Sequence, residues 1–240
     1  MDFLLLSQAA SEVTAGTPEM FSDLAPPLQV AIMLGALSFA VAMLVSVTAF
    51  TRIIIVLSFV RRALSTQEIP PNQVMLGLSL FLTLFVMAPT FDKIHKNAVI
   101  PLMEAQANQE EGEKLEFGYL DGWKIASEEL KTFMMANTRT SDLELFFELS
   151  ETPPPSQRID TPMKVAVPAF IISELKTAFI MGFCIYIPFL LIDLVISTIL
   201  MALGMMMMPP VVVSTPCKLL LFVLVDGWQL ISKALVASFA

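Results

Sequence analysis

The sequence predicts an all-α protein of the integral-membrane type, in which about four apolar helices form two hairpins on either side of a small, polar, mostly helical region. Of the 240 residues, 56% are hydrophobic and only 15% are charged. The apolar residues fall in long uncharged runs, which are typical of membrane helices, rather than in the short periodic patterns of a soluble core. The order of these runs predicts four parts: 1–27, 28–90, 91–164 and 165–240.

The composition excludes several classes of function. The net charge of −8, with 14 Lys and Arg residues, argues against a nucleic-acid-binding surface. His95 is the one histidine, and Cys184 and Cys217 lie in apolar segments without the spacing of metal ligands. The chain carries no Gly-rich phosphate loop. We therefore expect no enzyme activity, no catalytic residues, no cofactor and no metal, so any transport must draw its energy from partner proteins or a proton gradient.

Residues 1–27 form an N-terminal segment before the first long apolar run. A signal peptide begins with basic residues, whereas this segment has Asp2, which carries the wrong sign. The segment is interpreted as either a mature terminus or a dispensable leader. The run Ala25-Pro26-Pro27 predicts a break before the first helix.

Residues 28–90 predict the first hydrophobic hairpin. Val30 to Phe50 is long enough for one bilayer-spanning helix, which Arg52 closes. Ile53 to Val60 is too short to span and is either a helix continuation or an interfacial piece. Val74 to Met87 predicts a second apolar helix that ends at Pro89.

Charge distribution predicts the orientation of this hairpin. Its connection contains Arg52, Arg61 and Arg62 against the single Glu68, which places the connection in the cytoplasm by the positive-inside rule. Asp92 to Lys164 contains fourteen acidic and eight basic residues and should therefore lie on the extracytoplasmic side. The simplest interpretation of these acidic runs is a set of solvated faces.

Two helices are expected within residues 91–164. Ser141 and Glu144 match a capping box, which predicts a helix that runs to about Leu149. Glu128 to Ala136 predicts a second, amphipathic helix. Pro153-Pro154-Pro155 predicts a rigid linker to the second hydrophobic hairpin.

Residues 165–240 contain two apolar segments that carry isolated charges. Thr177 to Leu203 is interrupted by Pro188 and Asp193, and Val211 to Val225 contains Lys218. A lone charge at mid-membrane depth costs about 2.5–3.5 kcal/mol, so both charged side chains should face protein or water. A structural ion pair, within one subunit or between subunits, and a direct role in conduction are equally open.

Glu174 and Lys176 precede the first of these segments. We expect both to be interfacial, and we count them with Asp193 and Lys218 as charges for assembly or gating.

The connection between the two segments is Gly204 followed by Met205, Met206, Met207 and Met208. Gly204 predicts a left-handed helix end and Pro209 favours extended backbone before it, so the methionines should form a loop. Because methionine is unbranched, uncharged and polarizable, such a loop would act as a deformable gasket. The alternative is a Met-rich turn buried between helices.

The sequence motifs resemble one family in particular. They cover roughly residues 30–90 and 160–230 and occur in order: Phe50-Thr51-Arg52-Ile53-Ile54-Ile55-Val56-Leu57-Ser58-Phe59, Pro70-Pro71-Asn72-Gln73-Val74, Ser173-Glu174-Leu175-Lys176-Thr177-Ala178-Phe179, Ile187-Pro188-Phe189-Leu190-Leu191-Ile192-Asp193-Leu194-Val195, the methionine loop, and Lys218-Leu219-Leu220-Leu221-Phe222-Val223-Leu224-Val225-Asp226-Gly227-Trp228. Together they resemble the FliP/SctR/YscR family of export-gate proteins from bacterial type III secretion systems.

The resemblance implies an assembly and a location. It implies about five copies of the chain joined by FliQ and FliR subunits, with FlhB and FlhA as further partners, at the centre of the flagellar basal body in the inner membrane. Unfolded flagellar proteins would pass through the middle. The resemblance also implies that the apolar helices are kinked and that the assembled gate stands largely above the bilayer plane.

The resemblance further implies that Met205, Met206 and Met207, with Met208 beside them, form a gasket around a pore. A narrow apolar ring dewets and excludes ions, yet flexible thioethers mould around any passing side chain. The resemblance also assigns the family's important buried charges to Asp193 and Lys218.

The competing hypothesis is a small-molecule or ion transporter with Asp193 as a proton-relay carboxylate. A transporter should bind its solute as a small autonomous unit, whereas an export gate requires a multi-subunit complex. A membrane-bound enzyme is disfavoured because the sequence offers no nucleophile, base or metal constellation.

Overall fold

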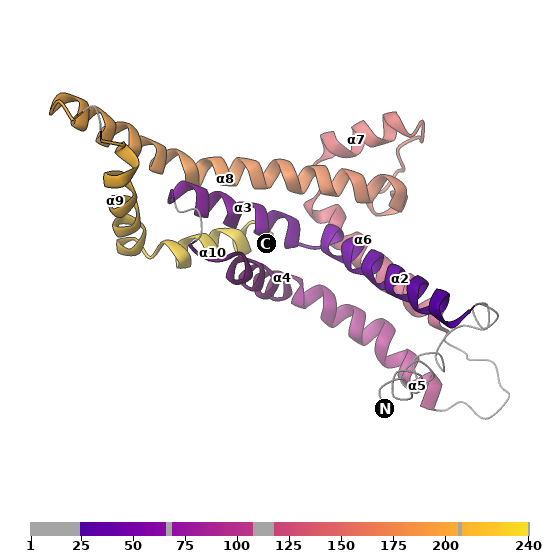
Figure 1. The fold of residues 1–240 in the computed structure, drawn as a ribbon. Coiled ribbons are helices and arrows are strands. Elements are labelled where there is room, and N and C mark those ends of the chain that lie inside the picture. Colours follow the sequence, from indigo (N-terminus) through magenta and orange to yellow (C-terminus); the bar gives the residue numbers. More distant parts are fainter. Residues whose placement is uncertain (1–24, 66–68, 108–117, 206–207, 240) are drawn as a thin grey trace, which may run out of the picture. The chain divides into compact units, whose positions relative to one another are not determined.

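Helices form most of the part of the chain that the computed structural model of this protein describes, and no β-strand occurs there (Figure 1). The described ranges are 25–65, 69–107, 118–205 and 208–239. The prediction of an all-α fold is thus confirmed. The chain divides into two compact units, Met1–Val45 and Ser46–Ala240, which are described separately.

The helices differ widely in length. Their bounds are α2 Pro26–Val47, α3 Phe50–Ala63, α4 Asn72–Ile94, α5 Ile100–Ala107, α6 Tyr119–Asn137, α7 Thr140–Leu149, α8 Met163–Ala202, α9 Pro210–Leu224 and α10 Gly227–Ala237. A π-helical turn, His95–Val99, joins α4 to α5, and a 3₁₀ turn, Arg158–Asp160, precedes α8.

The first unit contains most of α2, a helix of 22 residues without an acidic or basic side chain. Large apolar side chains such as Leu37, Phe39 and Val41 are more than half exposed. A helix that is apolar all round suits a lipid or protein environment rather than water.

The second unit is organised around α3 and α8, which pack along each other. Ile53, Val56, Leu57 and Val60 of α3 are completely buried. Their spacing of three and four residues puts them on one helix face, which becomes the core side. Helix α8 carries Gly182 where the Phe59 ring approaches, and a Cβ added there would lie 2.5 Å from that ring. The close approach of the two helices therefore depends on this glycine.

Two apolar clusters complete the second unit. One joins α3 with α4, α8, α9 and α10, and it includes Met75, Met87, Ile231 and Leu235. The other joins α6 and α7 to the first part of α8, around Phe170. Helix α8 belongs to both clusters and so connects them.

Some helices continue through residues that were expected to end or interrupt them. Pro89 lies inside α4, and Pro188 and Asp193 lie inside the 40-residue α8. The predicted stop at Pro89 is therefore wrong, whereas the third apolar segment is one helix that runs through both Pro188 and Asp193. A proline removes one backbone hydrogen bond, but ending the helix in apolar surroundings would expose several more polar groups.

Other boundaries also differ from the prediction. Helix α2 ends at Val47, before the expected Phe50, and α3 is a separate helix. Helix α7 ends at Leu149 as predicted, but it begins at Thr140 and has no side-chain cap, so the capping box of Ser141 is wrong. Instead, the Arg139 N–H donates to Ser173 Oγ of α8 at 3.0 Å, and a contact between helices satisfies this donor.

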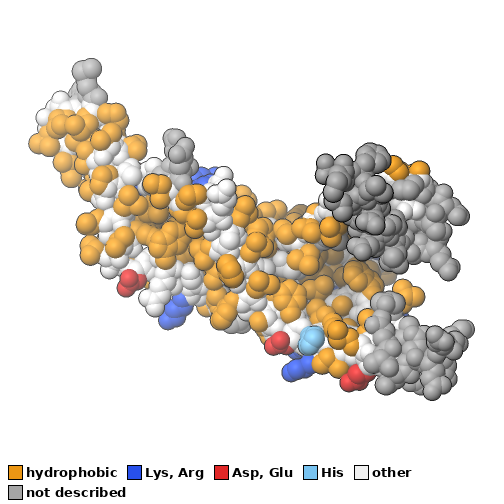
Figure 2. Space-filling view, turned by 60° about the horizontal axis from the view of Figure 1, so that its bottom comes forward, with side chains coloured by type: hydrophobic (Ala, Val, Ile, Leu, Met, Phe, Trp, Pro, Cys, Tyr) orange, Lys and Arg blue, Asp and Glu red, His pale blue; other side chains and the backbone are white. Residues whose placement is uncertain are grey.

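Among the described residues, three helical stretches are long and apolar enough to cross a membrane: Pro27–Val47, Asn72–Ala105 and Met163–Ala202. The bent pair α9 and α10, with 65° between its two helices, gives a fourth if it counts as one span. Figure 2 shows apolar side chains covering much of one face of the molecule. These findings agree with the prediction of about four apolar helices.

Candidate functional site

The methionine loop follows a well-defined helix end. Gly204 adopts φ +74°, its N–H donates to Met201 O at 3.0 Å, and the Met205 N–H donates to Leu200 O at 3.0 Å. This pair of bonds is a Schellman motif, which satisfies carbonyls that the helix end leaves free. The predicted left-handed stop at Gly204 is confirmed.

The described part of the loop turns back at once. The Met208 N–H donates to Met205 O at 3.2 Å, and α9 then begins at Pro210. Proline at this first helical position costs nothing, because its missing N–H would have no partner inside the helix. Met206 and Met207 lie outside the described residues.

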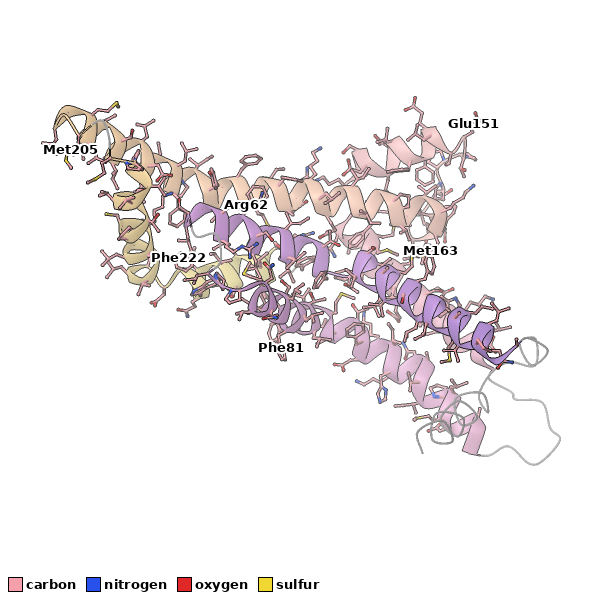
Figure 3. All side chains as sticks on the ribbon, viewed as in Figure 1. Arg62, Phe81, Glu151, Met163, Met205 and Phe222 are labelled. Carbon is pink, nitrogen blue, oxygen red and sulfur yellow. The ribbon has the colours of Figure 1, made fainter. Side chains whose placement is uncertain are left out.

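The loop occupies the far end of the hairpin of α8 and α9, where Figure 3 labels Met205. Met205 is 41% exposed and Met208 is 38% exposed within this chain. The neighbouring side chains Leu203, Val211 and Val212 are also exposed. The two described methionines are therefore not buried between helices of the single chain.

Lys218 of α9 is buried, at 1% exposure, and joins three parts of the chain. Its Nζ donates to Asp193 Oδ2 of α8 at 2.6 Å and to Ser65 Oγ, just after α3, at 2.7 Å. Of the possibilities that the sequence left open, the structure contains the ion pair between Asp193 and Lys218, within one chain. The contact with Ser65 has no signal in the sequence, because Ser65 lies 153 positions away from Lys218.

Two polar atoms near Lys218 make no hydrogen bond. Asp193 Oδ1 and Ser214 Oγ are buried atoms without a hydrogen-bond partner in the structure. Ser214 lies four residues before Lys218 and so shares its helix face. The Asp193 side chain is nevertheless 40% exposed as a whole, so this ion pair lies at the edge of the packed region.

Glu174 belongs to a second ion pair, with Arg52. The Arg52 Nε donates to Glu174 Oε2 at 2.7 Å, and the Nη2 of Arg52 donates to Glu174 Oε1. The side chains are 3% and 0% exposed. Glu174 is thus inside the protein and not interfacial as the sequence analysis expected, because a bidentate arginine compensates its charge there.

Arg52 also reaches the end of α10. Its Nη1 donates to Ser238 O at 2.8 Å and to Ser238 Oγ at 2.9 Å, while its guanidinium lies 3.7 Å from the centroid of the Phe239 ring. From the sequence, Arg52 is interpreted only as a helix end and a topological charge, and its contact with α10 is not predicted. The signal that could have found it is a charged residue within an apolar run of the sequence, because such a charge needs a partner.

Lys176 is the one predicted charge that the structure does not bring to either pair. It is exposed on α8, two residues after Glu174. Cys184 and Cys217 are free and exposed. Within the described ranges, no three His, Cys, Asp or Glu residues form a group able to hold a metal ion.

The long apolar helices and the charges paired inside them define an all-α membrane protein. Comparison with known proteins assigns it further. The FliP family model matches residues 33–235, and the chain belongs to this family.

The chain covers most of the length of three relatives in this family. The chain is 51% identical to the flagellar biosynthetic protein FliP of Bacillus subtilis strain 168, over 87% of the chain and 90% of the relative. Identity is 49% to FliP of Pectobacterium carotovorum, over 88% and 78% respectively. It is 41% to FliP of Caulobacter vibrioides, over 98% and 84%.

Proposed function

We propose that this chain is a pore-forming subunit of the flagellar type III protein export gate and conducts unfolded flagellar proteins through a channel closed by its methionine loop. Membership of the FliP family supports the flagellar role. The proposal that the loop closes a channel depends on the position of Met205 and Met208, which are exposed at the tip of a hairpin. Apolar side chains that remain exposed at the tip of a chain suit a contact between several copies.

The proposed assembly contains about five copies of the chain with FliQ and FliR, and FlhB and FlhA act nearby. Its place is the bacterial inner membrane, at the centre of the flagellar basal body. The exposed apolar faces of α8 and α9, which include Leu191, Leu194, Leu220 and Val223, supply surface for such subunits and for lipid. No step in this function requires an enzyme active site.

Replacement of Met205, Met206 and Met207 by Ala tests the seal. A loop tolerates truncation better than a packed core, so the variant should assemble and then let ions or small solutes cross the membrane. If the three side chains were instead buried, each would cost about 2–5 kcal/mol and assembly would fail before any leak. Growth and ion leakage are the readouts.

Met201→Ala is the matched control, because Met201 is equally apolar and exposed but lies on α8 before the loop. It should leave permeability unchanged. A triple variant that assembles and stays as impermeable as the parent chain would overturn the gasket.

We also propose that residues 91–164 are extracytoplasmic. Arg61 and Arg62 lie at the end of α3, next to the start of α4, whereas the polar region follows its far end. At 1.5 Å per residue, the stretch Asn72–Ala105 is about 50 Å long, enough to separate the two ends across a bilayer. Arg52 does not contribute to the positive charge that orients this hairpin, because it is buried and paired with Glu174.

A Lys124→Cys variant without Cys184 and Cys217 tests this orientation, because Lys124 is exposed on α6. An impermeant thiol reagent should label it in intact spheroplasts. Labelling that requires lysis would reverse the topology.

The alternative function is a small-molecule or ion transporter that uses Asp193 as a proton relay. The unpartnered Oδ1 of Asp193 is the observation in its favour. Native mass measurement of the protein with its co-expressed neighbours separates the two functions. A large hetero-oligomer supports the export gate, and a solute-binding monomer supports the transporter.

A further inference from the structure

Helices α9 and α10 form a corner whose shape is fixed by packing. The two helices meet at 65°, and Asp226 between them adopts φ 50°. The Phe222 ring of α9 packs edge-on against Trp228 of α10 at 5.2 Å and also contacts Phe189 of α8. A Cβ on Gly227 would lie 2.3 Å from the same ring. Because protein interiors transmit displacement rather than absorb it, movement of α10 must move α9.

The corner is attached to the rest of the unit at two places. On α9, Lys218 binds Asp193 and Ser65. On α10, the last turn ends at Ser238, whose carbonyl and hydroxyl oxygens both accept hydrogen bonds from Arg52. One anchor therefore lies on each limb of the corner.

The second anchor has a definite physical basis. The guanidinium of Arg52 lies at the carboxyl end of α10, where the helix dipole favours a cation. Glu174 neutralises the same guanidinium from α8. The Phe239 ring contacts the guanidinium, 3.7 Å from its centroid, and stacks with the Phe133 ring of α6 at a centroid distance of 6.1 Å. The end of α10 is thus bound by hydrogen bonds, by charge and by ring contacts at once.

We propose that Arg52 is a positioning residue for the methionine loop: by holding the end of α10, it orients α9 and the loop that precedes α9. The hydrogen bonds of Arg52 go to Glu174 and Ser238 and not to Met205 or Met208, the described residues of the loop. Its significance for gating rests on the proposed function, but the orientation of α9 is a property of the single chain and is measured without any leak or export assay.

A plain structural role is the alternative, in which Arg52 only joins α3 to α8 through Glu174. Ser238→Ala combined with Phe239→Leu separates the two roles. This double variant weakens the hold on α10 and leaves the pair between Arg52 and Glu174 in place. If Arg52 only joins α3 to α8, the position of α9 should not change in this variant.

The chain's own cysteines provide the measurement. Cys184 on α8 and Cys217 on α9 are both free and exposed, so each accepts a nitroxide label without further substitution. Pulsed electron double resonance on the purified full-length chain in detergent then gives the distribution of distances between α8 and α9. A second pair, Cys184 with a cysteine at the exposed Leu230 in a Cys217→Ser background, reports on α10 itself.

Both distributions should broaden in the Ser238→Ala, Phe239→Leu variant, with retained helicity and an undisturbed Phe59 contact between α3 and α8. Lys233→Ala, on the exposed face of α10, is the matched control and should leave both distributions as they are. Broadening of neither pair, or of the Leu230 pair alone, would overturn the proposal.

If the double variant does not fold, Ser238→Ala alone gives the same test, since it removes one accepted hydrogen bond and retains the ring contacts. An Arg52→Lys variant adds a rescue criterion. Lysine keeps the charge beside Glu174 but lacks the planar fork that reaches two partners at once, so α3 and α8 should stay packed while α9 loses its orientation. A lysine variant with parental distances would contradict the inference. Failure of the methionine seal would leave these distances unaffected.

Discussion

The two ion pairs of the second unit carry the same charges but lie in different environments. Arg52 and Glu174 are both buried, and the arginine makes two parallel bonds to the carboxylate. In the other pair Lys218 is buried, but the Asp193 side chain is 40% exposed and one of its oxygens has no partner. A bidentate arginine fixes distance and orientation together, whereas an ammonium is a point charge that accepts many geometries.

The two pairs stand at opposite ends of the same helix contact. Arg52 and Phe59 of α3 meet Glu174 and Gly182 of α8, so residue numbers rise together and the helices run parallel. The last turn of α3, about 16 Å beyond Arg52, then leads to Ser65 beside Lys218. The buried pair of Arg52 and Glu174 fixes the packing of α3 against α8, and the pair nearer the methionine loop leaves its carboxylate able to rearrange.

The largest effect is expected from Glu174→Ala. This change leaves the Arg52 guanidinium buried without its counter-charge, which costs about 3–5 kcal/mol. The helical fold should unfold at a clearly lower denaturant concentration in detergent. Circular dichroism during titration with denaturant gives the measurement.

Lys176→Ala is the control for this prediction, because Lys176 lies two residues away on the same helix and is exposed. It should change the free energy of unfolding by no more than about 0.5 kcal/mol. Equal losses of unfolding free energy from the two substitutions would show that the buried pair does not stabilise the fold more than an exposed charge does.

Asp193→Ala should have a smaller effect on stability and a larger relative effect on assembly or export. Lys218 loses its counter-charge, but it keeps Ser65 Oγ as an acceptor and water can reach the half-exposed site. We therefore expect a loss below the range of about 3–5 kcal/mol that applies to fully buried pairs. Motility and native mass of the complex are the readouts.

A double-mutant cycle sharpens this prediction. If the two charges act mainly on each other, Asp193→Ala with Lys218→Ala is no worse than either single change. Parental motility in the Asp193→Ala variant, or strictly additive losses, would count against their coupling.

Gly182→Ala tests the contact that lies between the two ion pairs. The added methyl group meets the Phe59 ring, which Phe179 and Phe183 also contact, so the ring has little room to move. Overpacking of this kind costs about 1–3 kcal/mol. Thermal unfolding of the purified chain measures the loss.

Gly77→Ala is expected to stabilise the fold rather than destabilise it. Gly77 lies in α4 with no atom within 4 Å of its Cβ position, so alanine should stabilise the helix by up to about 1 kcal/mol. A destabilised Gly77→Ala variant would mean that another subunit or a lipid occupies this face.

The smallest effect is expected from Ser65→Ala. It removes one acceptor from Lys218 and should cost about 0.5–1.5 kcal/mol. Because Ser65 adopts φ 57°, Ser65→Gly is the useful comparison: it loses the same hydrogen bond but relieves the backbone. Alanine should therefore be the worse of the two by unfolding measurements.

Local features of this chain were predictable from its sequence. The turn at Gly204 follows from one residue type and its neighbours, and the structure has it in that form. The cost of lone charges in apolar helices predicted that Asp193 and Lys218 face protein or water, and left their ion pair as one of two possibilities. The functional role of the methionine loop and the topology of residues 91–164 stay predictions.

Contacts between distant parts of the chain were not predictable in the same way. The partner of Glu174 lies 122 positions away, and the sequence contains no signal for that pairing. Pro89 was predicted to end a helix and Pro188 to interrupt one, because local rules penalise proline, yet the surroundings keep both helices continuous. Helix α10, which completes the corner with α9, was missed because its apolar residues merge with the preceding segment.

The parallel packing of α3 and α8 has a consequence for synthesis. Arg52 leaves the ribosome 122 residues before Glu174, which at typical elongation rates of about 5–20 residues per second is a delay of about 6–24 s. During that interval the arginine has no buried counter-charge and must stay in contact with water or lipid headgroups. The α3 segment therefore enters its final position only after most of α8 has been made, so the native contact forms late in biogenesis.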